Sequence, residues 1–311
     1  MRPQRSHIAI LALALCAASL AVVPTAFAAD SGTIAFQGFR RGSDTPVSVF
    51  TMAADGGNVK RIATGEEPSI SPDGKKIAFV AAGGPNRRFP EIFVMDSDGT
   101  NVRELTDGRE APKNPTISPD GTEMLYIAEG KGPAFEGSQV FVMTISGSDA
   151  TQLTHASPQG QGLPFAATEP SFAPNGKRVV FIGYNEHGTD VETIKTDGTD
   201  RTVLGKNAPI SNPTHPSYAP DGRRIVFQAN GADRTGKSSV YTFDPNTGAD
   251  LDKINKGDTE ALEPAWSPNS RSIVFRRGIN LFSMTPEGSG VEQLTDIEGK
   301  DGANFFPSWG R

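Results

Sequence analysis

The chain has 311 residues, of which 36% are hydrophobic, 21% charged and 8% aromatic, and its formal net charge is −6 at pH 7. This composition indicates a folded globular protein with a sizeable core and excludes disordered and collagen-like chains. The acidic balance argues against general nucleic-acid binding, because it leaves no excess of cations to neutralise a phosphate backbone. The 34 glycines and 24 prolines indicate many turns.

The N-terminal segment has the organisation of a secretory signal peptide. Arg2 and Arg5 precede an uncharged apolar stretch at residues 8–23, and residues 26–28 (AFA) match the A-x-A cleavage pattern. A membrane anchor is the competing interpretation, but the stretch is shorter than the roughly 20 residues of a span and is followed by Pro24. The pattern therefore favours a cleaved signal peptide without a membrane span.

We accordingly expect residues 1–29 to be removed and residues 30–311 to form one exported domain, periplasmic or extracellular. Cys16, the only cysteine, lies in the removed segment. The exported domain must then be stable without disulfides, and it is long enough to be so.

One pattern of alternating apolar residues recurs along the rest of the chain at intervals of about 43 to 55 residues. Its copies are PSISPDGKKIAFV at Pro68, PTISPDGTEMLYI at Pro115, PSFAPNGKRVVFI at Pro170, PSYAPDGRRIVFQ at Pro216, PAWSPNSRSIVFR at Pro264 and the short PSWGR at Pro307. The spacing is close to that of four-stranded propeller blades, and the period of two indicates β-strands. We find no sustained helical periodicity after the signal segment, so the fold is predicted to be all-β.

Each repeat divides into four short strands separated by turns. In the first copy these are residues 68–71, 75–80, 91–96 and 101–105. Residues 71–74 (SPDG) carry the residues of a tight turn, with proline second, aspartate third and glycine in the fourth position, where a left-handed backbone is easily adopted. Each repeat is thus predicted to be an antiparallel sheet built from hairpins.

The two chain ends complement each other. Residues 31–37, 49–52 and 59–62 match the second, third and fourth strands of the repeat, whereas residues 307–311 match the first. Together with five complete repeats they predict a six-bladed β-propeller with four strands per blade. The N-terminal strands and the C-terminal strand would share one blade and leave no open sheet edge.

The pattern P-x-[aromatic/Ile]-[Ser/Ala]-P-[Asp/Asn]-G-x-x-[Ile/Val]-x-F resembles the WD40-like (PD40) repeat of the TolB-like propeller family, and it covers nearly the whole chain after the signal segment. The resemblance implies a periplasmic propeller that docks a partner, such as the lipoprotein Pal of the Tol-Pal envelope system. TolB carries an α/β domain ahead of its propeller, which we do not expect here. Similar repeats also occur in prolyl oligopeptidase-like enzymes, whose hydrolase domain we likewise do not expect.

The long connections are predicted to lie on one face of the propeller. First-to-second and third-to-fourth strand turns are short, whereas the other connections are long and face the opposite side, at residues 81–90, 128–138, 155–169, 205–215, 229–238 and 296–306. Functional residues tend to lie on such variable loops of a rigid scaffold. We call this side the long-loop face and expect binding there.

The residue before each repeat proline is expected at the channel mouth on that face. These channel-mouth residues are Glu67, Asn114, Glu169, His215, Glu263 and Phe306. Three carboxylates on alternate blades predict a cation site, either for calcium held by Glu67, Glu169 and Glu263 or for a lysine or arginine of a partner. The alternative is three separately hydrogen-bonded glutamates without a ligand.

Three arginine pairs predict a basic patch on the same face, because ring closure makes their blades consecutive. The patch comprises Arg40, Arg41, Arg87, Arg88, Arg276 and Arg277. Such a patch would dock an acidic protein or an anionic envelope polymer. Charge scattered for solubility is the alternative.

Enzyme motifs are few. Residues 231–238 match the P-loop pattern, but residues 239–243 align with a third strand rather than the helix that nucleotide binding needs. We therefore expect a monomeric, non-catalytic propeller that binds a protein or envelope partner and needs no cofactor beyond the calcium just considered. The alternative is a lyase, lactonase or glycosidase that works in the channel mouth.

Overall fold

The computed structural model describes residues 30–40, 47–84, 89–107, 111–129, 137–155, 166–185, 188–231, 237–257, 259–297 and 302–311. The predicted signal peptide lies outside these residues, so its removal and the domain boundary at residue 30 stay predictions. No helix in the described part of the chain is long and apolar enough to cross a membrane.

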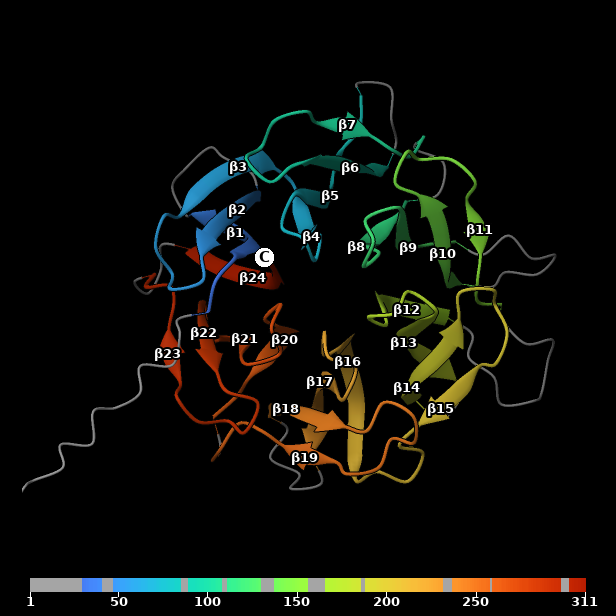
Figure 1. The fold of residues 1–311 in the computed structure, drawn as a ribbon, viewed down its shortest axis with the longest axis vertical. Helices are drawn as coiled ribbons and strands as arrows, with labels where there is room; N and C mark the ends of the chain where they lie inside the picture. Colours follow the sequence, from blue (N-terminus) through green and yellow to red (C-terminus); the bar gives the residue numbers. More distant parts are fainter. Residues whose placement is uncertain are drawn as a thin grey trace, which may run out of the picture.

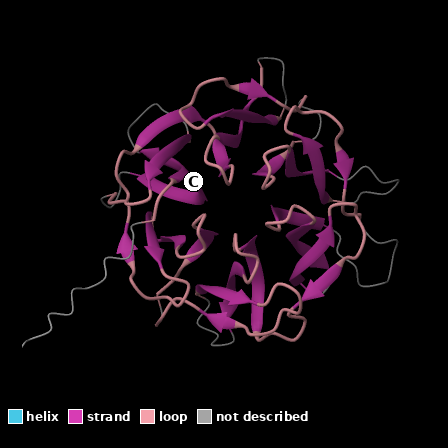
Figure 2. Ribbon diagram, viewed as in Figure 1, coloured by secondary structure: helices cyan, strands magenta, loops and turns pink. Residues whose placement is uncertain are grey.

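The described residues form six antiparallel sheets of four strands arranged around a central channel, which confirms the six-bladed propeller (Figure 1). Strands and loops account for all of them, without a helix (Figure 2). Blade 1 consists of β24 (Gly302–Gly310), β1 (Thr33–Arg40), β2 (Ser48–Ala53) and β3 (Lys60–Thr64). Blade 2 consists of β4 (Glu66–Ile70), β5 (Lys76–Ala82), β6 (Pro90–Asp96) and β7 (Arg103–Glu104).

The other four blades follow in chain order. Blade 3 consists of β8 (Lys113–Ile117), β9 (Glu123–Glu129), β10 (Ser138–Thr144) and β11 (Thr151–Gln152), and blade 4 of β12 (Ala166–Phe172), β13 (Arg178–Asn185), β14 (Gly188–Lys195) and β15 (Thr202–Leu204). Blade 5 consists of β16 (Ile210–Tyr218), β17 (Ile225–Gly231), β18 (Ser238–Phe243) and β19 (Asp252–Lys253), and blade 6 of β20 (Leu262–Trp266), β21 (Ile273–Arg277), β22 (Asn280–Met284) and β23 (Glu292–Gln293). The first-named strand of each blade lies nearest the channel (Figure 1).

Blade 1 joins the two ends of the described chain. β24 pairs with β1 in an antiparallel register that places Trp309 opposite Ile34 and Gly302 opposite Arg40. The strand is longer than the sequence predicts, because its pairing with β1 extends over residues 302–306, ahead of the repeat proline. The ring is therefore continuous through the sheet that contains both ends.

The predicted tight turns are present between first and second strands. In residues 71–74 the Gly74 amide donates to the Ser71 carbonyl at 2.8 Å, and Gly74 has a φ of +72°. A Cβ atom on Gly74 would lie 1.7 Å from the Arg311 carbonyl oxygen. Glycine is thus required here both by the left-handed backbone and by the close approach of the C-terminal residue.

The fourth strands are shorter than predicted, with only two residues in several blades. A side chain just after the strand continues the pairing where the backbone ladder stops. In blade 2 the Thr106 hydroxyl accepts a hydrogen bond from the Ile92 backbone amide at 3.0 Å, and in blade 3 the Thr154 hydroxyl accepts one from the Val140 backbone amide at 2.9 Å. The outer edge of each blade is therefore held partly by side chains.

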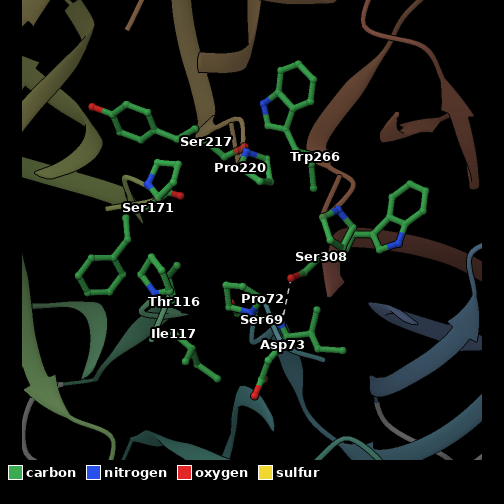
Figure 3. A pocket seen from close by; sticks show the side chains of 18 of the residues that line it. Ser69, Pro72, Asp73, Thr116, Ile117, Ser171, Ser217, Pro220, Trp266 and Ser308 are labelled. Carbon is green, nitrogen blue, oxygen red and sulfur yellow. Dashed lines mark hydrogen bonds between the residues drawn. The ribbon is translucent and has the colours of Figure 1, made fainter. Parts of the chain in front are cut away.

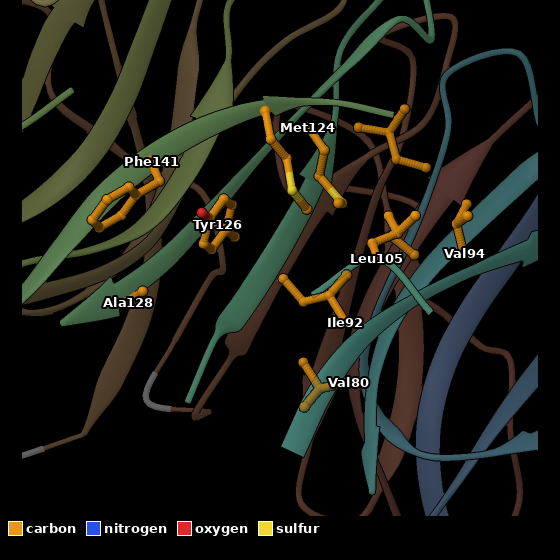
Figure 4. Packing of buried hydrophobic residues seen from close by; sticks show 11 residues of the cluster. Val80, Ile92, Val94, Leu105, Met124, Tyr126, Ala128 and Phe141 are labelled. Atoms are coloured by element: carbon orange, nitrogen blue, oxygen red, sulfur yellow. The ribbon is translucent and has the colours of Figure 1, made fainter. Parts of the chain in front are cut away.

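The hydrophobic core is divided among the six interfaces between neighbouring blades. Each cluster of buried residues combines side chains from two adjacent sheets. Between blades 2 and 3, for example, Ile92 and Leu105 pack against Met124 and Tyr126 (Figure 4). Because both faces of every sheet are apolar, each blade needs a neighbour on both sides, and we expect stability to depend on closure of the ring.

Deletion of residues 307–311 tests this closure. The deletion removes Trp309, which is 7% exposed and packs in the interface between blades 6 and 1. Loss of one buried tryptophan costs about 3–5 kcal/mol, so we expect the melting temperature to fall by roughly 10 °C or more. Differential scanning calorimetry measures the shift, and deletion of Arg311 alone is the control. A truncated protein that melts within about 2 °C of the parent would refute a closure-dependent ring.

Candidate functional site: the central channel and its two mouths

The residues before the repeat prolines meet at one mouth of the channel. A cavity of about 190 Å³ is lined by all six predicted channel-mouth residues, together with the prolines that follow them. It lies where the innermost strands begin, which is the long-loop face. The structure therefore brings these six side chains together, although whether they bind a ligand is a separate question.

All six share an unusual backbone conformation. Their φ angles are positive: Glu67 51°, Asn114 47°, Glu169 53°, His215 52°, Glu263 52° and Phe306 49°. Each sits at an irregularity in the pairing of the innermost strand with its neighbour. A non-glycine residue in this region costs about 1–2 kcal/mol, so the surrounding structure must hold it there.

Hydrogen bonds from the preceding blade provide that support. The backbone N–H of Asn114 donates to Glu67 Oε2 at 2.7 Å, that of His215 to Glu169 Oε2 at 2.6 Å, and that of Phe306 to Glu263 Oε2 at 2.8 Å. In each pair the carboxylate comes from one blade and the amide from the next. The glutamates on alternate blades therefore fasten neighbouring innermost strands together.

At two other junctions between blades a glutamine side chain accepts the corresponding hydrogen bond. The Glu67 amide donates to Gln37 Oε1 at 2.8 Å, and the Glu263 amide donates to Gln228 Oε1 at 2.9 Å. At the junction of blades 3 and 4, the Thr116 hydroxyl donates instead to the Pro170 carbonyl at 2.9 Å. The sequence analysis missed this ring of inter-blade bonds, although Gln37 and Gln228 occupy equivalent places in their repeats.

The three glutamates differ in their electrostatic surroundings. Glu263 is paired with Arg276, whose Nη2 lies 2.9 Å from its Oε1. Glu169 Oε1 lies 3.8 Å from His215 Nε2. Glu67 has no such ion pair within the described residues, and burial raises the pKa of its carboxyl group, with a smaller contribution in the same direction from Glu66.

The predicted calcium site gains no support from this geometry. Among the residues that the structure describes, no three His, Cys, Asp or Glu side chains form a group able to hold a metal ion. One oxygen of each glutamate already accepts a backbone amide. The ligand-free alternative accounts for these contacts, and calcium binding stays a prediction without a part in the function proposed below.

The basic patch is only partly described, because Arg41, Arg87 and Arg88 lie outside the described residues. Arg40 lies over the Phe50 ring and donates to Asn304 Oδ1 at 3.2 Å, and burial lowers its pKa. Arg276 is engaged by Glu263 as described above. These two guanidinium groups therefore make contacts within the propeller, and a continuous basic patch stays a prediction.

The opposite mouth holds a larger cavity, of about 410 Å³, that the sequence analysis did not predict. Its wall includes Phe172, Tyr218, Trp266 and Trp309, and the prolines of the tight turns surround it (Figure 3). The two cavities share one belt of residues: Ser69, Thr116, Ser171, Ser217, Ala265 and Ser308. The third residue of each repeat, which is aromatic or isoleucine, lines this cavity, so its recurrence in the sequence could have indicated the second mouth.

Six four-stranded blades around a channel with two lined mouths define this chain as a β-propeller. A model of the TolB beta propeller domain matches residues 76–309, and the chain belongs to that family. The chain is 38% identical over 72 residues to the Tol-Pal system protein TolB of Jannaschia sp. (strain CCS1), which is 23% of this chain and 15% of that protein. It spans about a fifth or less of the length of the curated relatives that it matches.

Solved structures support the fold. TolB from Acinetobacter baumannii superposes with a TM-score of 0.70 and 21% identity, over 90% of this chain and 67% of that one. Oligogalacturonate lyase from Vibrio parahaemolyticus has a TM-score of 0.54 and 12% identity, over 82% of this chain and 74% of that one. At these identities the likeness concerns the fold, which binding proteins and enzymes share.

Substitutions of Glu67 test the inter-blade bonds. Glu67→Ala leaves the Asn114 amide without its acceptor and is expected to cost about 1–3 kcal/mol of stability. Glu67→Gln keeps an acceptor oxygen of the kind that Gln37 and Gln228 supply, and it is expected to be at least as stable as the parent at pH 7. Urea unfolding measures both. Equal stability of the alanine and glutamine variants would contradict the proposed role.

The pH dependence of the same pair gives a second test. Since the folded state raises the pKa of Glu67, its stabilising contribution is complete below the ordinary glutamate pKa and is lost as pH rises through the folded value. Glu67→Gln does not titrate, so its stability relative to the parent should increase with pH over that interval. A difference that is constant from pH 4 to pH 8, measured by urea unfolding, would show that burial does not perturb this carboxyl group.

Proposed function

We propose that this TolB-like propeller is an exported, non-catalytic protein that binds a protein or envelope partner through its long-loop face and channel mouth. The observation that carries the proposal is the convergence of six side chains, one from each blade, around a single cavity at that mouth. A surface assembled from all six blades on a rigid ring suits recognition of a protruding part of a partner.

The chemistry of the mouth supports binding more than catalysis. Glu263 is held by both Arg276 and the Phe306 amide, and Glu169 is held by the His215 amide. A general acid or base must exchange protons with a substrate, whereas these carboxylates maintain the backbone of neighbouring blades. The Phe306 ring lies tilted beside the His215 ring, with centroids 5.6 Å apart, and adds an aromatic surface for a partner.

One observation favours the alternative of an enzyme acting on a small molecule or glycan. His215 Nε2 lies 3.8 Å from Glu169 Oε1, and His215 Nδ1 is buried without a partner among the described residues. A carboxylate beside an imidazole at a cavity is a common arrangement for proton transfer. An oligogalacturonate lyase among the similar structures shows that such folds also occur in enzymes.

Capture from an envelope extract, with mass spectrometry, tests the binding proposal. The double variant His215→Asn with Phe306→Asn changes the mouth but keeps the backbone bonds, and asparagine already occupies the equivalent position at Asn114. Arg223→Ala is the control, since that side chain is 85% exposed and belongs to a short turn on the opposite face. We expect a partner that the parent and the control capture and the double variant loses. Equal capture by all three would contradict binding at this mouth.

Assays of uronate oligosaccharides and lactones separate the enzyme alternative. The binding proposal predicts no turnover by the parent protein. Turnover that Glu169→Gln abolishes, with the fold retained by circular dichroism, would favour the enzyme instead.

A further inference from the structure

Arg277 departs from the repeat at a position that is otherwise small. It is the last residue of β21, the second strand of blade 6. The equivalent residues in the other five blades are glycine or alanine: Gly38, Ala81, Ala128, Gly183 and Ala229. A long cationic side chain at a site where five repeats keep a small residue breaks a local rule, and such departures concentrate at functional positions.

The surroundings of Arg277 hold its guanidinium group in place. Its Cζ lies 5.3 Å from the centroid of Phe275 and 5.0 Å from that of Phe282. Phe275 is fully buried, and Phe282 packs on the same core cluster. Two ring contacts restrict the plane of the guanidinium group, so less conformational entropy remains to be lost when it binds a ligand.

Arg277 lies at the end of β21 that faces the long-loop side. β21 and β22 are joined by a tight hairpin in which Arg277 pairs with Asn280. Only two residues, Gly278 and Ile279, lie between these strands. The hairpin of blade 6 is therefore short on the side where the proposed partner would approach.

Arg277 differs from the other arginines that contact aromatic rings. Among the described residues, Arg40 reaches Asn304, Arg201 reaches Glu192 and Arg276 reaches Glu263. The Nε atom of Arg277 is buried without a hydrogen-bond partner, and none of its nitrogens has an ion pair or hydrogen bond within the described residues. Among the described residues, its positive charge is thus positioned but has no hydrogen-bonded or ion-paired partner.

We propose that Arg277 is the anchor for a carboxylate of an acidic protein segment that docks on the long-loop face. The two terminal nitrogens of the guanidinium group offer parallel donors at the spacing of carboxylate oxygens. The ring contacts keep these donors aligned, and a ligand carboxylate supplies the negative charge that the described residues do not place beside them. An acidic side chain is therefore the chemistry that complements this position.

This inference deepens the proposed function, because it specifies the chemistry of one contact on the same face. It also assigns Arg277 a different role from its neighbour Arg276, which forms an ion pair with Glu263. Of the described arginines in the predicted basic patch, Arg277 is the one that we assign to recognition.

Titration with an acidic peptide tests the assignment. The probe is acetyl-hexaglutamate amide, and acetyl-hexaglutamine amide is the neutral reference. In a ¹⁵N-labelled sample the Nε–Hε signal of Arg277 is identified by its loss in Arg277→Lys. We expect this signal to shift saturably with the glutamate peptide and not with the glutamine peptide.

Two variants distinguish recognition from packing. Arg277→Met keeps a long apolar chain over the two phenylalanine rings but removes the charge, and the matched control is Arg223→Met on the opposite face. We expect Arg277→Met to weaken glutamate-peptide binding about tenfold by calorimetry, the loss of one charged hydrogen-bonded contact. The affinity of Arg277→Lys should lie between those of the parent and Arg277→Met, because lysine keeps the charge without the planar pair of donors.

The outcomes separate this inference from the proposed function. Unchanged peptide affinity in Arg277→Met, or a shift that the glutamine peptide reproduces, would overturn the carboxylate anchor. Capture of an envelope partner that depends on the channel mouth but is unaffected by Arg277→Met would also overturn it and leave the proposed function intact. Glutamate-peptide binding at Arg277 without any captured partner would support the anchor and count against the proposed function.

Discussion

Every sheet of this protein presents apolar side chains on both faces, and this single constraint determines the architecture. A sheet with two apolar faces needs a neighbour on each side, and a row of such sheets would leave two faces uncovered at its ends. Closing the row into a ring covers both of these end faces. The pairing of β24 with β1 joins the two ends within one blade, and Trp309 of that strand packs in the interface between blades 6 and 1.

The ring also constrains the channel. Six innermost strands enter it with the same irregular, positive-φ residue before proline, and the amide that this conformation exposes must find an acceptor. For five of the six residues, all but Glu169, the acceptor comes from the neighbouring blade, as glutamate where the inner strand supplies it and as glutamine where the second strand does. The glutamates that suggest a cation site in the sequence therefore also fasten neighbouring blades, because each accepts a backbone amide across a junction.

The candidate site could be predicted in its position but not in its chemistry. The residue before each repeat proline identifies the channel mouth, because strand order fixes which residue enters the channel first. The partner of Glu263 could not be foreseen, since Arg276 reaches it across a hairpin whose side-chain directions depend on the register. Arg276 and Arg277 are adjacent in sequence yet make different contacts, because successive strand residues point to opposite faces. The larger cavity at the opposite mouth was missed because the long loops directed attention to the other face, whereas this cavity is lined by the third residues of the repeats and by the prolines of the short turns.

The sequence alone determined the number of blades, the four-strand pattern and the sharing of one blade by both ends, because repeat spacing, period-two alternation and turn residues are local properties of the chain. It could not determine which charges neutralise one another, since Glu263 with Arg276 and Glu67 with the Asn114 amide meet only when strands and blades are packed. The same holds for the guanidinium group of Arg277, whose two phenylalanine contacts arise from strand pairing. Local chemistry thus specified the scaffold, and packing decided which side chains meet within it.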